Sequence, residues 1–138
     1  MACGIYCFIA IEILNSKMNE DNKSLEELIN QGLTNAEHYY SHNDGFDDEL
    51  IHFYRLFSKK MQYVERDDVN SGLYVVDTLE ASVWCLLNND NYKDTVLCAV
   101  NLGGDTDTTA SVCGGLAGLY YGLDSIPTGW LKELVRYN

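Results

Sequence analysis

The segment 101–122 reads NLGGDTDTTASVCGGLAGLYYG, and it constrains the fold more than any other part of the chain. A pair of glycines comes before a cluster of acids and threonines, and a run of small residues follows. Four of the small residues recur at every fourth position and so share one helix face: Ala110, Gly114, Gly118 and Gly122. Because each glycine costs a helix interior about 1 kcal/mol relative to alanine, we expect a packing reason for this face. The segment predicts a helix over 108–121 that approaches another helix closely in a core.

The first half of the chain also carries helical signals. The apolar run Met1–Leu14 predicts a buried first helix, and the S-x-x-E pattern that begins at Ser24 predicts a second helix that ends near His42. The segment Phe46–Lys60 predicts a third helix, with four side chains on one face: Leu50, Phe53, Tyr54 and Phe57.

Three more helices are expected in the second half. Apolar residues at helical spacing predict helices over 77–87 and 92–101, and Pro127 suits the first turn of a last helix that ends near Tyr137. A loop is expected over 67–72, and the β-branched run at 74–76 is the one strand-like piece. The fold class that we predict is all-α: a compact helical bundle of about six or seven helices.

Length and composition bound the class of protein. With 138 residues, the chain is either one domain or a fragment of a larger one, and its 46% hydrophobic and 22% charged residues are typical of a soluble globular protein. Met1–Leu14 is shorter than the roughly 20 residues of a membrane span and has no basic leader, so we expect neither a signal peptide nor a membrane partner. Five cysteines without a CxxC pattern are read as reduced, buried thiols of a cytoplasmic protein: Cys3, Cys7, Cys85, Cys98 and Cys113.

The net charge limits the ligands. The chain carries a net charge of −12, with its acids spread along the whole sequence and no cluster of lysine or arginine. A nucleic acid would be repelled by this charge, so nucleic acid is not an expected partner. An anionic small molecule would need a bound cation or a helix N-terminus to attract it.

The acids at the start of the glycine-rich helix form a candidate metal site. Residues two apart in a helix point to nearly opposite sides, so Asp105 and Asp107 can converge only if the chain is not yet helical at Asp105. Gly103 and Gly104 permit such a sharp approach, and Thr108 is well placed to join the two acids. Two carboxylates and a hydroxyl suit Mg²⁺, Mn²⁺ or Ca²⁺ rather than zinc. The alternative is that Asp105 caps the helix, with Thr108 or Thr109 supplying further capping oxygens.

Other polar groups are weaker candidates. His38 and His42 are four residues apart, but no H-E-x-x-H pattern or nearby cysteine supports a metal site, so we read them as surface residues. Asp47 and Asp48 are read as first-turn acids that complement the helix dipole. Glu80 is a lone glutamate in a helix, and such a group is usually solvated or paired.

Three ordered motifs resemble the ADP-ribosylglycohydrolase family. GGDTDT with the following small-residue helix and AGLYYG is similar to the C-terminal motif of that family. GLYVVDTLEASVWCLL at 72–87 looks like the motif one helix pair upstream, and IPTGWLKEL at 126–134 looks like the closing helix. The resemblance covers the chain from Met1 to its end and implies that it is the C-terminal part of the family's all-α domain.

The resemblance also implies an activity and a site. Members of the family hydrolyse ADP-ribosyl linkages with two Mg²⁺ or Mn²⁺ ions, which position the ribose and a water. Carried over to this sequence, the metal ligands are Asp105, Asp107 and Thr108, and the residues near the substrate are Gly103, Gly104, Gly72 and Tyr74. The partner would be ADP-ribose or an ADP-ribosylated substrate, and no catalytic residue is assigned.

One departure from the family pattern limits the expected activity. The family's other metal ligands come from a T-D-D-T type motif and an earlier acid, and this sequence has neither. We therefore expect a hydrolase of this type whose site is completed by an N-terminal portion or a partner chain, and an isolated chain that is poorly active. The alternative is a truncated, non-catalytic homologue that binds ADP-ribose or acts as a structural protein. A homo-oligomer is also plausible, and the sequence does not identify the ADP-ribosyl linkage or the natural start.

Overall fold

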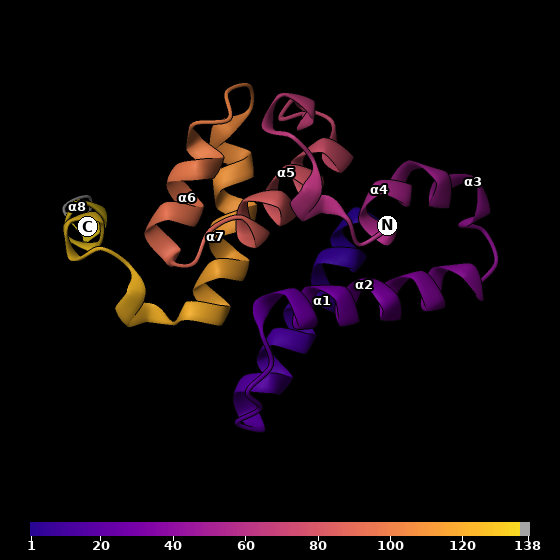
Figure 1. Cartoon of the computed structure of the whole chain (residues 1–138), viewed down its shortest axis with the longest axis horizontal. Coiled ribbons are helices and arrows are strands. Elements are labelled where there is room, and N and C mark those ends of the chain that lie inside the picture. Colours follow the sequence, from indigo (N-terminus) through magenta and orange to yellow (C-terminus); the bar gives the residue numbers. More distant parts are fainter. Residues whose placement is uncertain (136–138) are drawn as a thin grey trace.

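The computed structural model describes residues 1–135, which form helices joined by short turns (Figure 1). The six longer helices are α1 (Ala2–Met18), α2 (Leu25–Ser41), α5 (Val75–Leu87), α6 (Tyr92–Val100), α7 (Thr106–Tyr121) and α8 (Thr128–Val135). Two short helices, α3 (Asp47–Leu50) and α4 (Tyr54–Phe57), and four 3₁₀ turns complete the set: Ile51–Phe53, Met61–Tyr63, Arg66–Asp68 and Leu123–Ser125. No strand occurs within the described range, so the predicted all-α class is confirmed.

The prediction of one helix over 46–60 is wrong. The chain there forms α3, a 3₁₀ turn and α4, and it ends at Phe57 before Lys59 adopts a left-handed conformation with φ 57°. Phe53 and Leu56 are buried, whereas Tyr54, predicted to share a face with Phe53, is 66% exposed. The two buried residues still share one side of the segment, and the interruption is the 3₁₀ turn Ile51–Phe53 between the two short helices.

The strand-like interpretation of 74–76 is also wrong. Tyr74 is the N-cap of α5, and Val75 and Val76 form its first turn. Val76 is buried in the core, so tertiary packing outweighs the weak β preference of the two valines. α1 runs four residues beyond the predicted end at Leu14, and the predicted end near Tyr137 lies outside the described residues.

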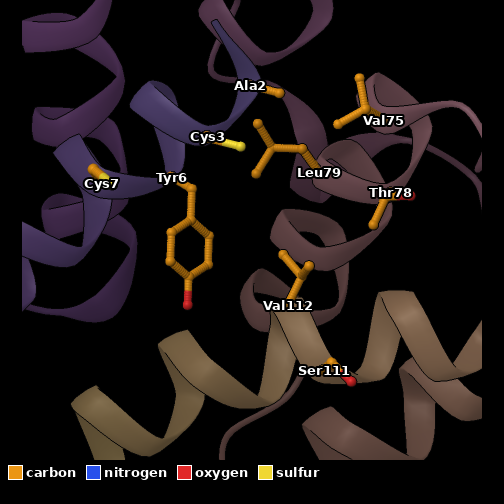
Figure 2. Close-up of a pocket in the computed structure, with 9 residues that line it drawn as sticks. All are labelled: Ala2, Cys3, Tyr6, Cys7, Val75, Thr78, Leu79, Ser111 and Val112. Carbon is orange, nitrogen blue, oxygen red and sulfur yellow. The ribbon is translucent and has the colours of Figure 1, made fainter.

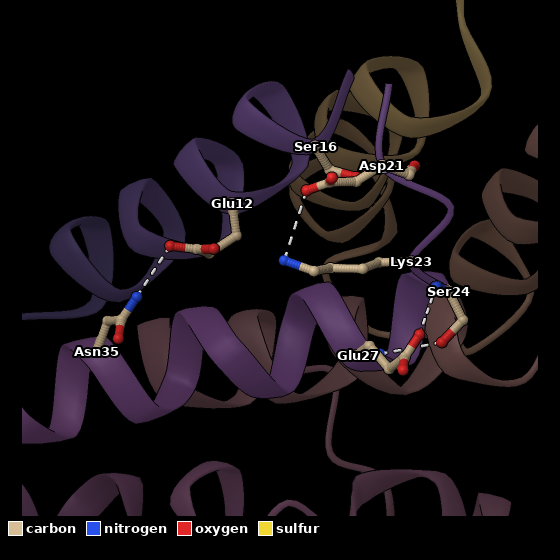
Figure 3. A network of polar contacts seen from close by, with 7 residues as sticks. All are labelled: Glu12, Ser16, Asp21, Lys23, Ser24, Glu27 and Asn35. Carbon is tan, nitrogen blue, oxygen red and sulfur yellow. Dashed lines mark hydrogen bonds and ion pairs between the residues drawn. The ribbon is translucent and has the colours of Figure 1, made fainter. Parts of the chain in front are cut away.

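The turn between α1 and α2 is fixed by the predicted capping box. The Ser24 amide donates to the Glu27 carboxylate at 2.7 Å, and the Glu27 amide donates to the Ser24 hydroxyl at 3.2 Å (Figure 3). Farther along the two helices, the side-chain amide of Asn35 donates to the Glu12 carboxylate at 2.9 Å. The satisfied N-terminus of α2 explains why the helix begins where the sequence predicts.

The closest helix contact in the core lies between α1 and α2. Ile5, Ile9 and Ile13 of α1 are fully buried, and a Cβ added at Gly32 of α2 would lie 2.6 Å from the Ile9 Cα. Glycine is therefore required at Gly32 for the two backbones to approach. The small-residue face of α7 is less crowded, because a Cβ at Gly114 would meet Tyr92 and Val96 of α6 at an ordinary 3.5 Å. The predicted contact of this face with another helix is present, but the backbone approach is at Gly32.

The cysteines differ from the prediction. Cys85 and Cys113 are buried and Cys98 is half-buried, but Cys3 and Cys7 are exposed on α1, and all five are free thiols. The prediction of buried thiols is thus wrong for the first two, because both lie on the outer side of a helix that is apolar on two sides. Within residues 1–135, the helices are too short or too polar for any of them to cross a bilayer.

Thiol reactivity should separate these groups. We expect a maleimide to modify Cys3 and Cys7 rapidly in the folded chain and to modify Cys85 and Cys113 only after unfolding. A hydrogen bond with Cys113, together with burial, raises the pKa of Cys85 to about 12, so little thiolate is available there. Mass spectrometry of the labelled chain, with a denatured sample as control, measures the order; early labelling of Cys85 would contradict the described packing.

Candidate functional site

The loop before α7 has the sharp backbone that the two glycines predict. Gly103 and Gly104 have φ values of 88° and 69°, a left-handed region that other residues rarely adopt. Asp105 follows as the N-cap of α7 with φ −84° and ψ 68°, so it is not yet helical. This is the condition under which the side chains of Asp105 and Asp107 can converge.

The segment before α5 holds this loop in place. The Asp105 amide donates to the Ser71 carbonyl at 2.8 Å, and the Ser71 hydroxyl donates to the Gly103 carbonyl at 2.7 Å. These bonds bring exposed Gly72 close to the candidate metal ligands, and Tyr74, 51% exposed, lies three residues after Ser71 at the start of α5. Four predicted substrate residues and three predicted metal ligands therefore belong to one region of the surface.

The side chains at the start of α7 form a small oxygen cluster. The Thr108 hydroxyl donates to Asp105 Oδ1 at 2.9 Å. Interaction with the Asp105 side chain, together with the backbone amides of Thr108 and Asp107, lowers the pKa of Asp107. Oxygens of three neighbouring side chains are thus available to a hard cation at the start of α7.

Helix capping does not account for this arrangement. Asp105 is the N-cap residue, but its side chain accepts no bond from a backbone amide of the helix. The Thr109 hydroxyl is buried and donates to the Asp105 carbonyl at 3.0 Å, so it steadies the backbone rather than capping it. The Asp105 carboxylate thus accepts from the Thr108 hydroxyl rather than from a backbone amide at the helix end.

The oxygens of Asp105, Asp107 and Thr108 suit a hard divalent cation but would fill only part of its coordination shell. Within residues 1–135, no group of three or more His, Cys, Asp or Glu side chains is arranged to hold a metal ion. His38 and His42 are exposed with their rings stacked at 4.3 Å, as expected for surface residues. Two carboxylates and one hydroxyl suit Mg²⁺ or Mn²⁺, which prefer six oxygen ligands and retain waters where protein ligands are few.

Glu80 is buried but paired. Its carboxylate lies 3.1 Å from the Arg55 guanidinium, and its side chain is only 6% exposed. Burial raises the pKa of Glu80, and the Arg55 charge opposes that rise. The residue therefore joins α5 to α4 and is not available as a metal ligand.

An apolar cavity of about 390 Å³ lies between α1, α5 and α7 (Figure 2). Its lining comprises Ala2, Cys3, Tyr6 and Cys7 from α1, Val75, Thr78 and Leu79 from α5, and Ser111 and Val112 from α7. The Ser111 hydroxyl donates to the Asp107 carbonyl at 2.7 Å, so the cavity begins one helical turn from the oxygen cluster. The sequence analysis does not predict this cavity or the role of Ser71, because both depend on contacts between distant segments. The local signal for the Ser71 segment is Gly72, the glycine that follows it.

Two glycine variants separate backbone strain from loop contact. We expect Gly103→Ala to cost about 1–2 kcal/mol, because it places a side chain in a left-handed conformation, and Gly104→Ala to cost more. An added Cβ at Gly103 has open space, whereas at Gly104 it would collide with the Ser71 carbonyl. Amide hydrogen exchange at Asp105 should therefore accelerate in Gly104→Ala and stay slow in Gly103→Ala; equal acceleration would contradict the contact.

The family model and the curated relatives that match this chain all belong to one class of protein, the hydrolases of ADP-ribosyl linkages. The family model for ADP-ribosylglycohydrolase matches residues 1–138. The ADP-ribosylarginine hydrolase Tri1 of Serratia proteamaculans is 47% identical over 72 residues, which is 52% of this chain and 20% of the relative. The ADP-ribosyl-[dinitrogen reductase] glycohydrolase of Rhodospirillum rubrum is 39% identical over 85 residues, or 62% of this chain and 27% of the relative.

A human protein is also similar to this chain. The human ADP-ribosylhydrolase ARH3 is 27% identical over 81 residues, covering 51% of this chain and 22% of the relative. The matched segments thus span between 20% and 27% of these curated relatives. The match of the family model along the whole sequence, together with the all-helical structure, shows that the chain belongs to the ADP-ribosylglycohydrolase family.

Proposed function

We propose that the chain supplies part of a metal-dependent site that hydrolyses ADP-ribosyl linkages. The observation that carries this proposal is the Thr108–Asp105 hydrogen bond beside the exposed Asp107, at a loop fixed by Ser71, in a member of this family. Asp107 and Thr108 are exposed, so their oxygens are accessible to a metal ion and a ligand.

Each residue has a proposed role. Asp105, Asp107 and Thr108 would hold Mg²⁺ or Mn²⁺, and the ion would supply positive charge for a diphosphate and lower the pKa of a water. Gly72, Gly103 and Gly104 leave room for the ligand to approach the backbone. The exposed ring of Tyr74 offers a flat apolar surface to the ribose or adenine.

The site needs further ligands for full activity. Three protein oxygens fill half of an octahedral shell, so this chain holds one ion weakly and leaves a second ion without protein ligands. We propose that the remaining ligands come from another part of the family domain, whether joined to this chain or separate. Since the Serratia relative is named an ADP-ribosylarginine hydrolase, arginine-linked ADP-ribose is the first substrate to test.

Manganese titration tests the metal half of the proposal. Electron paramagnetic resonance of free Mn²⁺ should reveal one weak site on the chain, lost in Asp107→Asn and weakened in Thr108→Val. Asp124→Asn is the matched control, because Asp124 is exposed and its substitution removes the same charge away from the site. Equal loss in Asp124→Asn would mean that Mn²⁺ responds only to the net charge of −12.

A turnover assay tests the incomplete shell. With Mg²⁺ and an ADP-ribosylated arginine peptide, the pure chain should release less than one ADP-ribose per molecule. Repeated turnover by the chain alone would contradict the proposal that the site is incomplete.

A further inference from the structure

α1 is apolar on two opposite sides. The inner side, with Ile5, Ile9 and Ile13, is buried against α2 and α7. The outer side carries a second stripe, called here the outer stripe: Cys3, Cys7, Ile11, Leu14 and Met18. At about 100° per residue, this stripe lies opposite Ile9, and all its members are exposed; Leu14 is 45% and Met18 81% exposed.

A helix with apolar stripes on two opposite sides buries both of them when it lies inside a larger protein. No helix within residues 1–135 is long and apolar enough to cross a bilayer. From Cys7 to Met18 the outer stripe has spacings of four, three and four residues, the repeat along which two helices pack side by side. This spacing points to a helix as the covering element.

The outer stripe continues into the cavity between α1, α5 and α7. Cys3 and Cys7 line that cavity together with Val75, and Figure 2 shows Cys3 directed toward Leu79 of α5. Leu73 and Val75, which are 88% and 52% exposed, extend the apolar surface toward the loop at Ser71. A single apolar surface therefore runs along α1 to the edge of the oxygen cluster.

We propose that the outer stripe and the cavity are covered by a helix from the part of the ADP-ribosylglycohydrolase domain that does not correspond to residues 1–138. The matched segments are 20–27% of the relatives and 51–62% of this chain, so a match over the whole chain would still leave more than half of each relative's length outside it. A second copy of this chain would bring another net charge of −12, which opposes close association. Lipid binding would need a basic border, but Lys17 is the one cation in α1, and it lies over the Tyr120 ring at 5.2 Å.

The place of this surface explains how the covering element reaches the site. Ser111 lines the cavity and is bonded to the Asp107 carbonyl, so a segment seated there lies within one helical turn of Asp107. The inference rests on the proposed function only in assigning the missing metal ligands to this same element.

Co-expression tests the covered surface. The full chain is produced together with the Serratia relative's polypeptide from its N-terminus to the start of the region that corresponds to residues 1–138. Light scattering after size-exclusion chromatography should show a one-to-one complex. Ile11→Asp should weaken it more than about tenfold, because a charge would be buried in the contact. The control Ile51→Asp changes the same residue type at a 70% exposed position off α1 and should leave the complex unchanged.

Cysteine labelling provides a second readout if the Serratia polypeptide does not fold as a separate chain. When this polypeptide is fused to Met1, it should protect Cys3 and Cys7 from maleimide. Both thiols should react with maleimide in the free chain. Continued labelling of both in a folded fusion would overturn the proposal. So would dimers of the free chain that Ile11→Asp dissociates, or binding of the free chain to phosphatidylcholine–phosphatidylserine vesicles. None of these readouts needs metal or hydrolysis, so a complex that forms but stays inactive would count against the proposed function alone.

Discussion

Replacing Arg55 with methionine should lower the free energy of unfolding by about 3–5 kcal/mol at pH 7, the cost of leaving a buried charge without its partner. Arg55 lies 3.1 Å from the Glu80 carboxylate, whose side chain is 6% exposed. Methionine keeps most of the aliphatic length of arginine, so the loss is chiefly that of the charge and of the bond to the Asp68 carbonyl. Urea unfolding followed by circular dichroism measures the change.

The pH dependence of this loss has a definite sign. Burial raises the pKa of Glu80 above its ordinary 4.5, and Arg55 opposes that rise, so the pKa rises further in Arg55→Met. A group with a raised folded-state pKa stabilises the fold below its unfolded pKa, and that contribution is lost as the pH rises through the folded value. The deficit of Arg55→Met should therefore shrink as the pH falls from 7 toward 4.5.

Two variants keep this prediction testable if Arg55→Met fails to fold. Glu80→Gln removes the charge but keeps the shape, so it should cost less than Arg55→Met. The double variant should be more stable than Arg55→Met alone, because no buried charge is left unpaired. A double variant that is less stable than Arg55→Met would contradict the ion-pair account.

Substituting alanine for Gly32 should cost about 3 kcal/mol, at the upper end of the usual cost of overpacking a core. The new Cβ would lie 2.6 Å from the Ile9 Cα and 2.9 Å from the Ile9 nitrogen, and neither backbone atom can rotate away. The two helices would have to separate along α1 and α2, exposing the isoleucines between them.

Gly129→Ala is the matched control for Gly32→Ala. Gly129 lies in α8 with no atom within 4 Å of an added Cβ, so alanine should be neutral or stabilise by about 0.5–1 kcal/mol. Chemical denaturation of both variants measures the difference. Equal effects at the two positions would mean that α1 and α2 are not in backbone contact at Gly32.

Local signals in the sequence account for the start of α2 and for the site loop. The capping box at Ser24 and the glycine pair at 103–104 each act within a few residues, so their effects are readable from the sequence. The break over 46–60 was not readable, because it depends on which of Phe53 and Tyr54 meets the core. The sequence shows that both residues are aromatic, but it does not show which of them is buried.

The candidate site divides in the same way. Asp105, Asp107 and Thr108 lie within four residues, so the sequence alone could predict that Thr108 meets Asp105. The Ser71 contact joins segments 32 residues apart, as the bond to Gly103 shows, and only the folded chain reveals it. The outer side of α1 also escaped prediction, because an apolar run does not state which of its sides the rest of the fold will cover.

Calorimetric titration of ADP-ribose into the pure chain tests the central claim most directly. It would be run with Mg²⁺, with EDTA, and with the Asp105→Ala/Asp107→Ala variant in Mg²⁺. We predict weak binding in Mg²⁺ that is lost in EDTA and in the double variant. Absence of binding in every condition, or binding unchanged by EDTA and by the double substitution, would contradict the claim that these residues form a metal-dependent ADP-ribose site.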